Sequence, residues 1–398
     1  ATTDTFTPLE RRAVMGTAMI AGLRLFGLFI IVPVFSAWAY INANASASEA
    51  GWVIAIYGLT QACLQIPFAM LSDRIGRKPV ITLGLLIFAA GSFVAAVAAY
   101  HNHMDGIFWG RALQGAGAIT GTAIALTGDF TREQTRLKGM MVVGMTIGAV
   151  FMLSFIVSPA LLGWWGMHGL FGMIGVLVLL ALGVLWWFIP PAPPLQKGVK
   201  ILEFVAVIQH KGLQQVYVGV WVLHMCLMAL FVMLPHLLKQ VVNLPIEDLW
   251  QVYTPALVGA LPLIGWLMKR ARGSVAPLQV ISVPSLLLML AALTLWPFMY
   301  THLWLNVLCL LLFFGGFSVL EAAQPSEVTR LAPATQKGAA SGMYAVCQFL
   351  GIFCGGLLGG YAYAQGSAEL TFVVLAGVVA VWLGVSWALG RAHVTRVS

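Results

Sequence analysis

The chain has 398 residues, of which 60% are hydrophobic and only 9% are charged, and its formal net charge is +8. An ordinary soluble domain carries roughly 25% charged residues, so the composition excludes that class and indicates an integral membrane protein. The cysteines lie in apolar runs without the spacing of a zinc site or a disulfide framework, so we expect no metal site.

Apolar runs long enough to cross the hydrocarbon core as helices, about 20 residues each, recur along the whole chain. They lack the short alternating pattern of a membrane β-barrel. We predict an all-α membrane protein with twelve transmembrane helices, over about 13–39, 50–70, 80–100, 107–129, 139–162, 167–189, 212–238, 250–268, 276–297, 303–327, 338–363 and 370–390.

The positive charges are distributed unevenly among the predicted loops. Of the 21 Lys and Arg residues, 18 lie near the termini or in alternate loops, whereas the opposite loops hold only Lys239. Cations accumulate on the cytoplasmic side of membrane proteins, so both termini are predicted to be cytoplasmic. Topology therefore explains the net charge, and we expect no nucleic-acid partner.

The longest predicted loop, which opens with "PPAPPLQKGVK", divides the chain into two halves. We predict a six-helix bundle over 1–189, a cytoplasmic linker over 190–211 and a second six-helix bundle over 212–398. A basic loop follows the second helix of each half, as "MLSDRIGRKPV" and "LMKRARGSVAPL". Such weak internal symmetry is typical of transporters built from repeats.

Three stretches carry a family resemblance. "MLSDRIGRKP" resembles the loop motif of the major facilitator superfamily, and "GRALQGAGAITGTAIALTGDFTREQTR" is similar to its fourth-helix arginine motif. "FIVSPALLGWWG" keeps Pro159 and Gly163 of the fifth-helix motif of the drug:proton antiporter branch, but has Ser158 and Leu162 where that motif has glycine. The resemblance implies a major facilitator fold in the bacterial inner membrane. It also implies a monomer that moves a small molecule by using the proton gradient, without a cofactor.

The loop after the second predicted helix contains a candidate latch. Gly76 permits a tight bend, and Arg77 has Asp129, at the end of the fourth predicted helix, as its best candidate acid. We predict that an Arg77/Asp129 pair closes the cytoplasmic side, with Asp73 offered to a helix N-terminus of the other half. Arg74 and Lys78 are also explained by topology alone.

Charges within predicted spans are costly and usually mark a pathway. Arg24 lies near the middle of the first span and needs an acid, carbonyl groups or an anionic substrate group. Arg111 lies in the outer part of the fourth span, where it either modulates proton uptake, as the resemblance implies, or snorkels to the interface. Glu321 is the acid placed deepest in a span and is the natural proton carrier, because removal from water favours a neutral carboxyl group.

Neutral polar residues at similar depth are candidates for the lining of a central cavity: Tyr57, Gln61, Gln65, His224, Tyr344 and Gln348. Gln61 and Gln65 are four residues apart and share a helix face. For each Gln or Tyr, hydrogen bonding between helices is the alternative. His224 is a candidate for proton coupling as well, against a role in packing.

These features favour a proton-coupled secondary transporter that works by alternating access and exports a small organic or drug-like molecule in exchange for protons. Because Arg24 and several glutamines make the interior polar, a transporter of a sugar, a peptide or another polar metabolite is the alternative. The sequence has no nucleotide-binding or hydrolase motif, so we do not expect an enzyme.

Overall fold

The computed structural model describes residues 5–191, 201–271, 274, 277–333, 335–365 and 367–397, and these residues form helices and no strands. The first half contains α1 (Pro8–Phe29), α2 (Val32–Ala43), α3 (Ala47–Ile75), α4 (Arg77–Tyr100), α5 (Met104–Ala116), α6 (Thr120–Phe130), α7 (Glu133–Gly183) and η1 (Val184–Phe188). The second half contains α8 (Ile201–Gln209), α9 (Lys211–Val241), η2 (Ile246–Asp248), α10 (Trp250–Ala271), α11 (Pro277–Leu295), η3 (Trp296–Phe298), α12 (Leu303–Leu331), α13 (Lys337–Gln365) and α14 (Ala368–Val397).

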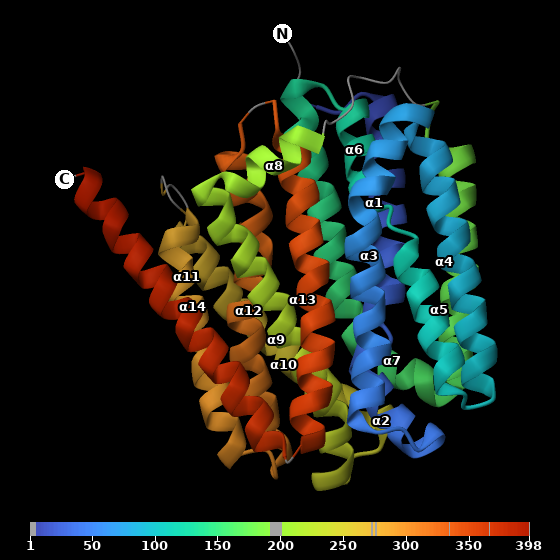
Figure 1. Cartoon of the computed structure of the whole chain (residues 1–398), viewed down its shortest axis with the longest axis vertical. Coiled ribbons are helices and arrows are strands. Elements are labelled where there is room, and N and C mark those ends of the chain that lie inside the picture. Colours follow the sequence, from blue (N-terminus) through green and yellow to red (C-terminus); the bar gives the residue numbers. More distant parts are fainter. Residues whose placement is uncertain are drawn as a thin grey trace.

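The helices stand side by side, and α1 begins and α14 ends at the same end of the molecule (Figure 1). That end, where α8 lies, is called the α8 end, and the opposite end, where α2 lies, is called the α2 end. In the same view the elements of the first half stand beside those of the second. Whether the α8 end faces the cytoplasm stays a prediction.

Ten helical segments of the described residues are long and apolar enough to cross a membrane, against the twelve predicted. The predicted span 107–129 is two shorter helices, α5 and α6, separated at residues 117–119. The predicted spans 139–162 and 167–189 are joined in α7, which bends at Gly166, where φ is 66° and ψ is 177°. A residue other than glycine would be strained there. The number twelve therefore stays a prediction.

Two further boundaries differ from those expected. The first predicted span breaks at Ile30 and Ile31, before Pro33, because proline cannot donate the hydrogen bond that would continue the helix. The second part of the predicted linker is helical as α8, and its Phe204 and Val207 pack against the C-terminal helices. The division at the linker stays a prediction, and residues 192–200 lie outside the described residues.

Small residues bring the two halves together near the α2 end. Gly51 and Gly356 face each other where α3 meets α13, and a side-chain carbon on Gly356 would lie 2.8 Å from the carbonyl oxygen of Gly51. Glycine pairs of this kind allow two helix backbones to approach closely in membranes.

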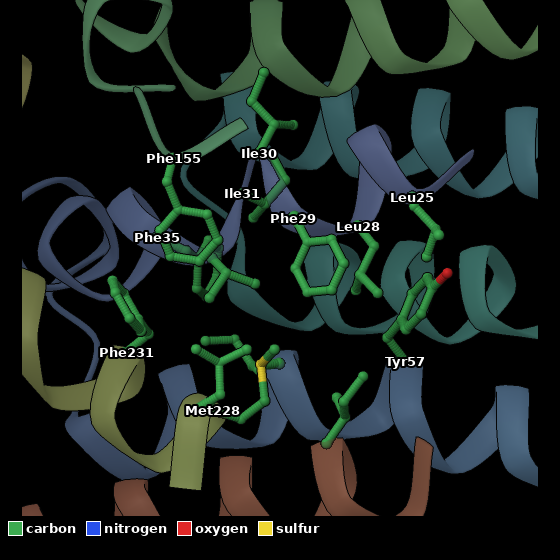
Figure 2. Packing of buried hydrophobic residues seen from close by; sticks show 14 of the residues in the cluster. Leu25, Leu28, Phe29, Ile30, Ile31, Phe35, Tyr57, Phe155, Met228 and Phe231 are labelled. Carbon is green, nitrogen blue, oxygen red and sulfur yellow. The ribbon is translucent and has the colours of Figure 1, made fainter. Parts of the chain in front are cut away.

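A layer of buried aromatic side chains lies beside this contact. The aromatic layer consists of Phe155 on α7, Phe231 on α9, Tyr253 on α10 and Phe314 on α12, all fully buried. Phe155 and Phe231 have ring centroids 4.7 Å apart with nearly perpendicular planes. Both belong to the same buried cluster as Phe35 of α2, and Figure 2 shows the three side chains. Because α7 belongs to the first half and the other three helices to the second, this layer seals the halves together.

Candidate functional site

Three polar side chains from three C-terminal helices form a cluster that we call the proton cluster: His224 on α9, Glu321 on α12 and Gln348 on α13. The Gln348 side-chain nitrogen lies 2.8 Å from His224 Nε2 and 3.3 Å from Glu321 Oε1. Glu321 Oε2 lies 3.6 Å from His224 Nε2. The His224 side chain is 1% exposed, whereas that of Glu321 is 31% exposed.

The backbone fixes the orientation of the His224 ring. Its Nδ1 lies 3.1 Å from the carbonyl oxygen of Val220, so Nδ1 donates and the neutral ring accepts from Gln348 at Nε2. Oε2 of Glu321 has no hydrogen-bond partner and is buried, as is the Tyr344 hydroxyl nearby on α13. A proton on Glu321 Oε2 would therefore complete this cluster, whereas a proton on His224 Nε2 would require the Gln348 amide to turn its oxygen toward the ring.

Arg24 lies in a second buried network, in the first half. Its Nε donates to the carbonyl oxygen of Gly117 at 3.2 Å, and its terminal nitrogens donate to the side chains of Thr120 and Gln61. Gln61 in turn donates to Gln65 at 2.8 Å. The helix break at 117–119 frees carbonyl groups, and Arg24 satisfies one of them. We expected Arg24 to need an acid, carbonyl groups or an anionic substrate group. In the structure it donates to one carbonyl group and to neutral side chains.

Arg111 lies in a third network and is fully buried. It donates to Gln114 at 2.9 Å, and Gln114 donates to Ser92 at 2.8 Å. The guanidinium lies over the Tyr57 ring, 4.6 Å from its centroid. Nε and one terminal nitrogen of Arg111, and the Tyr57 hydroxyl, have no hydrogen-bond partner. Since its side chain is fully buried, Arg111 does not snorkel.

The residues of the candidate latch meet at the α8 end. Arg77 Nε lies 3.0 Å from Asp129 Oδ2, and a terminal nitrogen donates to Ser72 at 2.6 Å and to Asp73. Gly76 separates α3 from α4 with a φ of 104°, a conformation that favours glycine. Asp73 accepts from Arg77, four residues later on the chain, and its expected contact with a helix N-terminus of the other half stays a prediction. The latch function itself stays a prediction.

A second ion pair at this end was missed by the sequence analysis. Glu10, at the start of α1, is buried and accepts from the backbone and the guanidinium of Arg132 and from the Thr135 hydroxyl at 2.7 Å. The side-chain hydrogen bonds to the Glu10 carboxylate raise the pKa of Arg132 above its ordinary value. The stretch "TPLE" at 7–10 is a capping box and predicts the start of α1, but no local signal predicts the contact with Arg132.

The fifth-helix motif lies in α7, near the contact between the halves. Pro159 is inside the helix, and a side-chain carbon on Gly163 would lie 3.0 Å from Glu247 of η2, in the second half. The preceding Ser158, which replaces an expected glycine, donates to the freed carbonyl oxygen of Ile30.

The candidate residues thus form separate groups. His224, Glu321 and Gln348 lie together, as do Arg24, Gln61 and Gln65. Among the described residues, Arg111 contacts Gln114 and Tyr57 of the first half, and it does not join the proton cluster. The aromatic layer, which also lies between the halves, was not identified from the sequence, since its members are far apart along the chain and sit in apolar runs without a motif.

Comparison with known proteins gives the family. The model of the Major Facilitator Superfamily matches residues 17–353. The inner membrane transport protein YajR of Escherichia coli is 37% identical over 384 residues, which are 96% of this chain and 84% of that protein. The multidrug resistance protein MdtH of Yersinia enterocolitica is 24% identical over 400 residues, covering 94% of this chain and 93% of that protein.

Solved structures of transporters have the same fold. The human organic anion transporter MFSD10 matches with a TM-score of 0.69 and 19% identity, covering 96% of this chain and 100% of that one. The nucleoside transporter NupG (D323A mutant) matches with a TM-score of 0.71 and 13% identity, covering 94% of this chain and 99% of that one. At such identities the likeness concerns the fold alone. With the family match over most of its length, this multi-pass membrane chain is a transporter, not an enzyme, and belongs to the Major Facilitator Superfamily.

Proposed function

We propose that this transporter is a proton-coupled antiporter of the bacterial inner membrane, which works as a monomer by alternating access and exports small organic or drug-like molecules. The observation that carries the proposal is the proton cluster, in which Glu321 and His224 can each hold a proton and share the Gln348 amide. The similarity to the multidrug resistance protein MdtH supports drug-like substrates.

The proton cluster can change its charge without moving a helix. When the carboxylate of Glu321 takes a proton on Oε2, the cluster becomes neutral, and loss of that proton restores the negative charge. His224 Nε2, 3.6 Å away, is the alternative acceptor. Because Glu321 is partly exposed, water or a cationic substrate group can reach it and favour the charged form. Proton and substrate would then exclude each other, as antiport requires.

The contacts between the halves support alternating access. The α2 end is sealed by the aromatic layer and by the hydrogen bond from the Tyr253 hydroxyl to the Pro33 carbonyl oxygen, at 2.8 Å. These contacts would have to separate for the transporter to open at the α2 end.

The test uses purified protein in proteoliposomes with an imposed pH gradient. We expect Glu321→Gln to abolish proton-driven accumulation of substrate and to flatten its pH dependence, while binding or passive exchange is partly retained, because glutamine keeps the shape but cannot carry the proton. Glu327→Gln is the matched control: Glu327 lies on the same helix, paired with Arg330 at 2.8 Å outside the proton cluster.

If Glu321→Gln still concentrates substrate against its gradient, the proton is carried elsewhere, with His224 and Asp129 next to be tested. If Glu327→Gln loses coupling as fully as Glu321→Gln, the effect is not specific to the proton cluster, and the proposal fails.

A polar metabolite such as a sugar or a peptide is the second candidate substrate, again with proton coupling. It is favoured by the networks of Arg24 and Arg111, which place two buried cations in the first half, with no acid of the described residues within ion-pair distance of either. Thermal-shift screening against matched sets of lipophilic cations and polar metabolites separates the two, since a ligand at 100 times its dissociation constant adds about 2.7 kcal/mol of stability.

A further inference from the structure

A groove lies on the outer surface of the second half, between α9 and α14. Its volume is about 810 Å³, and valine and tryptophan side chains, among them Val218, Trp221 and Val381, line most of it. Val218 is 45% exposed and Val381 is 70% exposed. The volume falls within the roughly 300–1,000 Å³ of small-molecule sites. The groove is therefore large enough for part of an extended apolar ligand.

A glycine leaves room in the α14 wall of the groove. Gly377 of α14 lines it, and a side-chain carbon built there would meet no atom within 4 Å. Trp382 also lines the groove and packs against α9, where a side-chain carbon on Gly219 would lie 3.1 Å from its ring. In Figure 1, α14 runs obliquely past α9. A larger residue at 377 would fill the groove without displacing a neighbour.

One end of the groove is polar. Lys211, the first residue of α9, lies there with Gln214 and Gln215, and Lys211 is the charged residue among those that line the groove. Gln214 donates to the Ile208 carbonyl oxygen at 2.8 Å, so its amide is held in place. The amino-terminal end of α9 adds the positive end of a helix dipole. A cation at one end of an apolar groove is complementary to a ligand with an anionic headgroup and a hydrocarbon tail.

We propose that this groove binds an anionic phospholipid, with the phosphate group at Lys211 and an acyl chain along Val218 and Val381 toward Gly377. In the predicted orientation Lys211 lies at the cytoplasmic leaflet, where basic residues attract anionic headgroups with about 1 kcal/mol per cation. This site is separate from the proton cluster, and the inference does not depend on the transported substrate.

The test measures lipid binding to the purified, delipidated full chain by native mass spectrometry. Phosphatidylglycerol and phosphatidylcholine with the same acyl chains are the two probes. We expect the wild type to bind phosphatidylglycerol about fivefold more tightly, and Lys211→Gln to remove that preference. Gly377→Phe should weaken both lipids about tenfold, the loss expected when about two CH₂ groups are no longer buried. Lys239→Gln, at the other end of the same helix, should change neither value.

Equal binding of the two lipids by the wild type would overturn the inference, and so would full binding by Gly377→Phe. A dimer that Gly377→Phe abolishes would show that a second copy of the chain occupies the groove, and would also overturn it. The thermal midpoint without lipid checks that the variant is folded. If Gly377→Phe cannot be purified, Val381→Phe replaces it, because that exposed side chain projects into the same groove.

Discussion

Arg24 carries its charge in the apolar interior because a broken helix supplies the oxygen atoms that it needs. The break between α5 and α6 leaves the Gly117 carbonyl group without a helical partner, and Arg24 donates to this carbonyl group. Arg24 also donates to the side chains of Thr120 and Gln61. A planar guanidinium can donate in three directions at once, which a lysine ammonium on a flexible stem does less well. Arg24 therefore links α1, α3 and the broken helix.

Replacement of Arg24 is expected to affect both stability and binding. Arg24→Ala leaves the buried Gln61 side-chain oxygen without its donor, which costs about 1–3 kcal/mol if it stays unpaired, whereas the Gly117 carbonyl group keeps its hydrogen bond from the Ile119 N–H. We expect a lower thermal midpoint and weaker substrate binding, with Arg24→Lys intermediate, measured by thermal unfolding and by ligand titration. Arg11→Ala, an exposed cation on the same helix, serves as the control. A normal midpoint in Arg24→Ala would argue against the structural role.

The elements carry the contacts that would have to change during transport. At the α8 end, Arg77 joins α4 to the end of α6 through Asp129, and Gly76 sets the turn between α3 and α4. At the α2 end, α3 and α13 touch through glycines. The same helix, α3, thus contributes to contacts at both ends, so its movement would couple them.

The ion pair can be tested by removing its negative charge. Asp129→Asn weakens the charge-assisted bond from Arg77, which is worth about 1.5–3 kcal/mol. We expect more of the inward-open state and less transport at an unchanged expression level. Labelling of single cysteines from the cytoplasmic side measures the shift, and a labelling rate identical to that of the wild type would contradict it.

The glycine contact can be tested by adding volume. In Gly356→Leu, the first side-chain carbon alone would lie 2.9 Å from Ala55, so α3 and α13 must separate. We expect greater access from the α2 end and a lower thermal midpoint, measured by thiol labelling and thermal unfolding. Gly144→Leu is the matched control, because a side-chain carbon there meets nothing within 4 Å. Equal effects of the two variants would show that access from the α2 end does not depend on the close contact of α3 with α13.

At the scale of the whole molecule, the described residues of the two halves meet in an apolar surface that contains the buried hydrogen bond from Tyr253 to Pro33. Tyr253→Phe keeps the ring in the aromatic layer but removes the hydrogen bond to the Pro33 carbonyl group, a loss of about 0.5–1.5 kcal/mol. We expect the population to shift severalfold, up to about tenfold, toward opening at the α2 end, measured by distances between spin labels on the two halves. Unchanged distance distributions would refute this.

Much of this architecture could be predicted from the sequence, because apolar runs of helical length predict most of the helices. The contact between Arg77 and Asp129 was also predicted, since each residue lies in a stretch that resembles a motif of the family. The partners of Glu10 and Arg24 could not be predicted, because they depend on how distant helices pack and on the helix break at residues 117–119, between α5 and α6. The aromatic layer could not be predicted for the same reason, because phenylalanines in an apolar run do not indicate which face of the helix contacts the other half.

The aromatic layer has a consequence for the energy supply of the cell. A proton crosses a protein along a continuous row of water molecules or exchangeable groups, and fully buried phenylalanine rings provide neither. With the layer in place, a transporter without bound substrate would not conduct protons. The proton gradient across the membrane would then not be dissipated through it. Edge-to-face packing of these rings would thus limit the loss of protons between transport cycles.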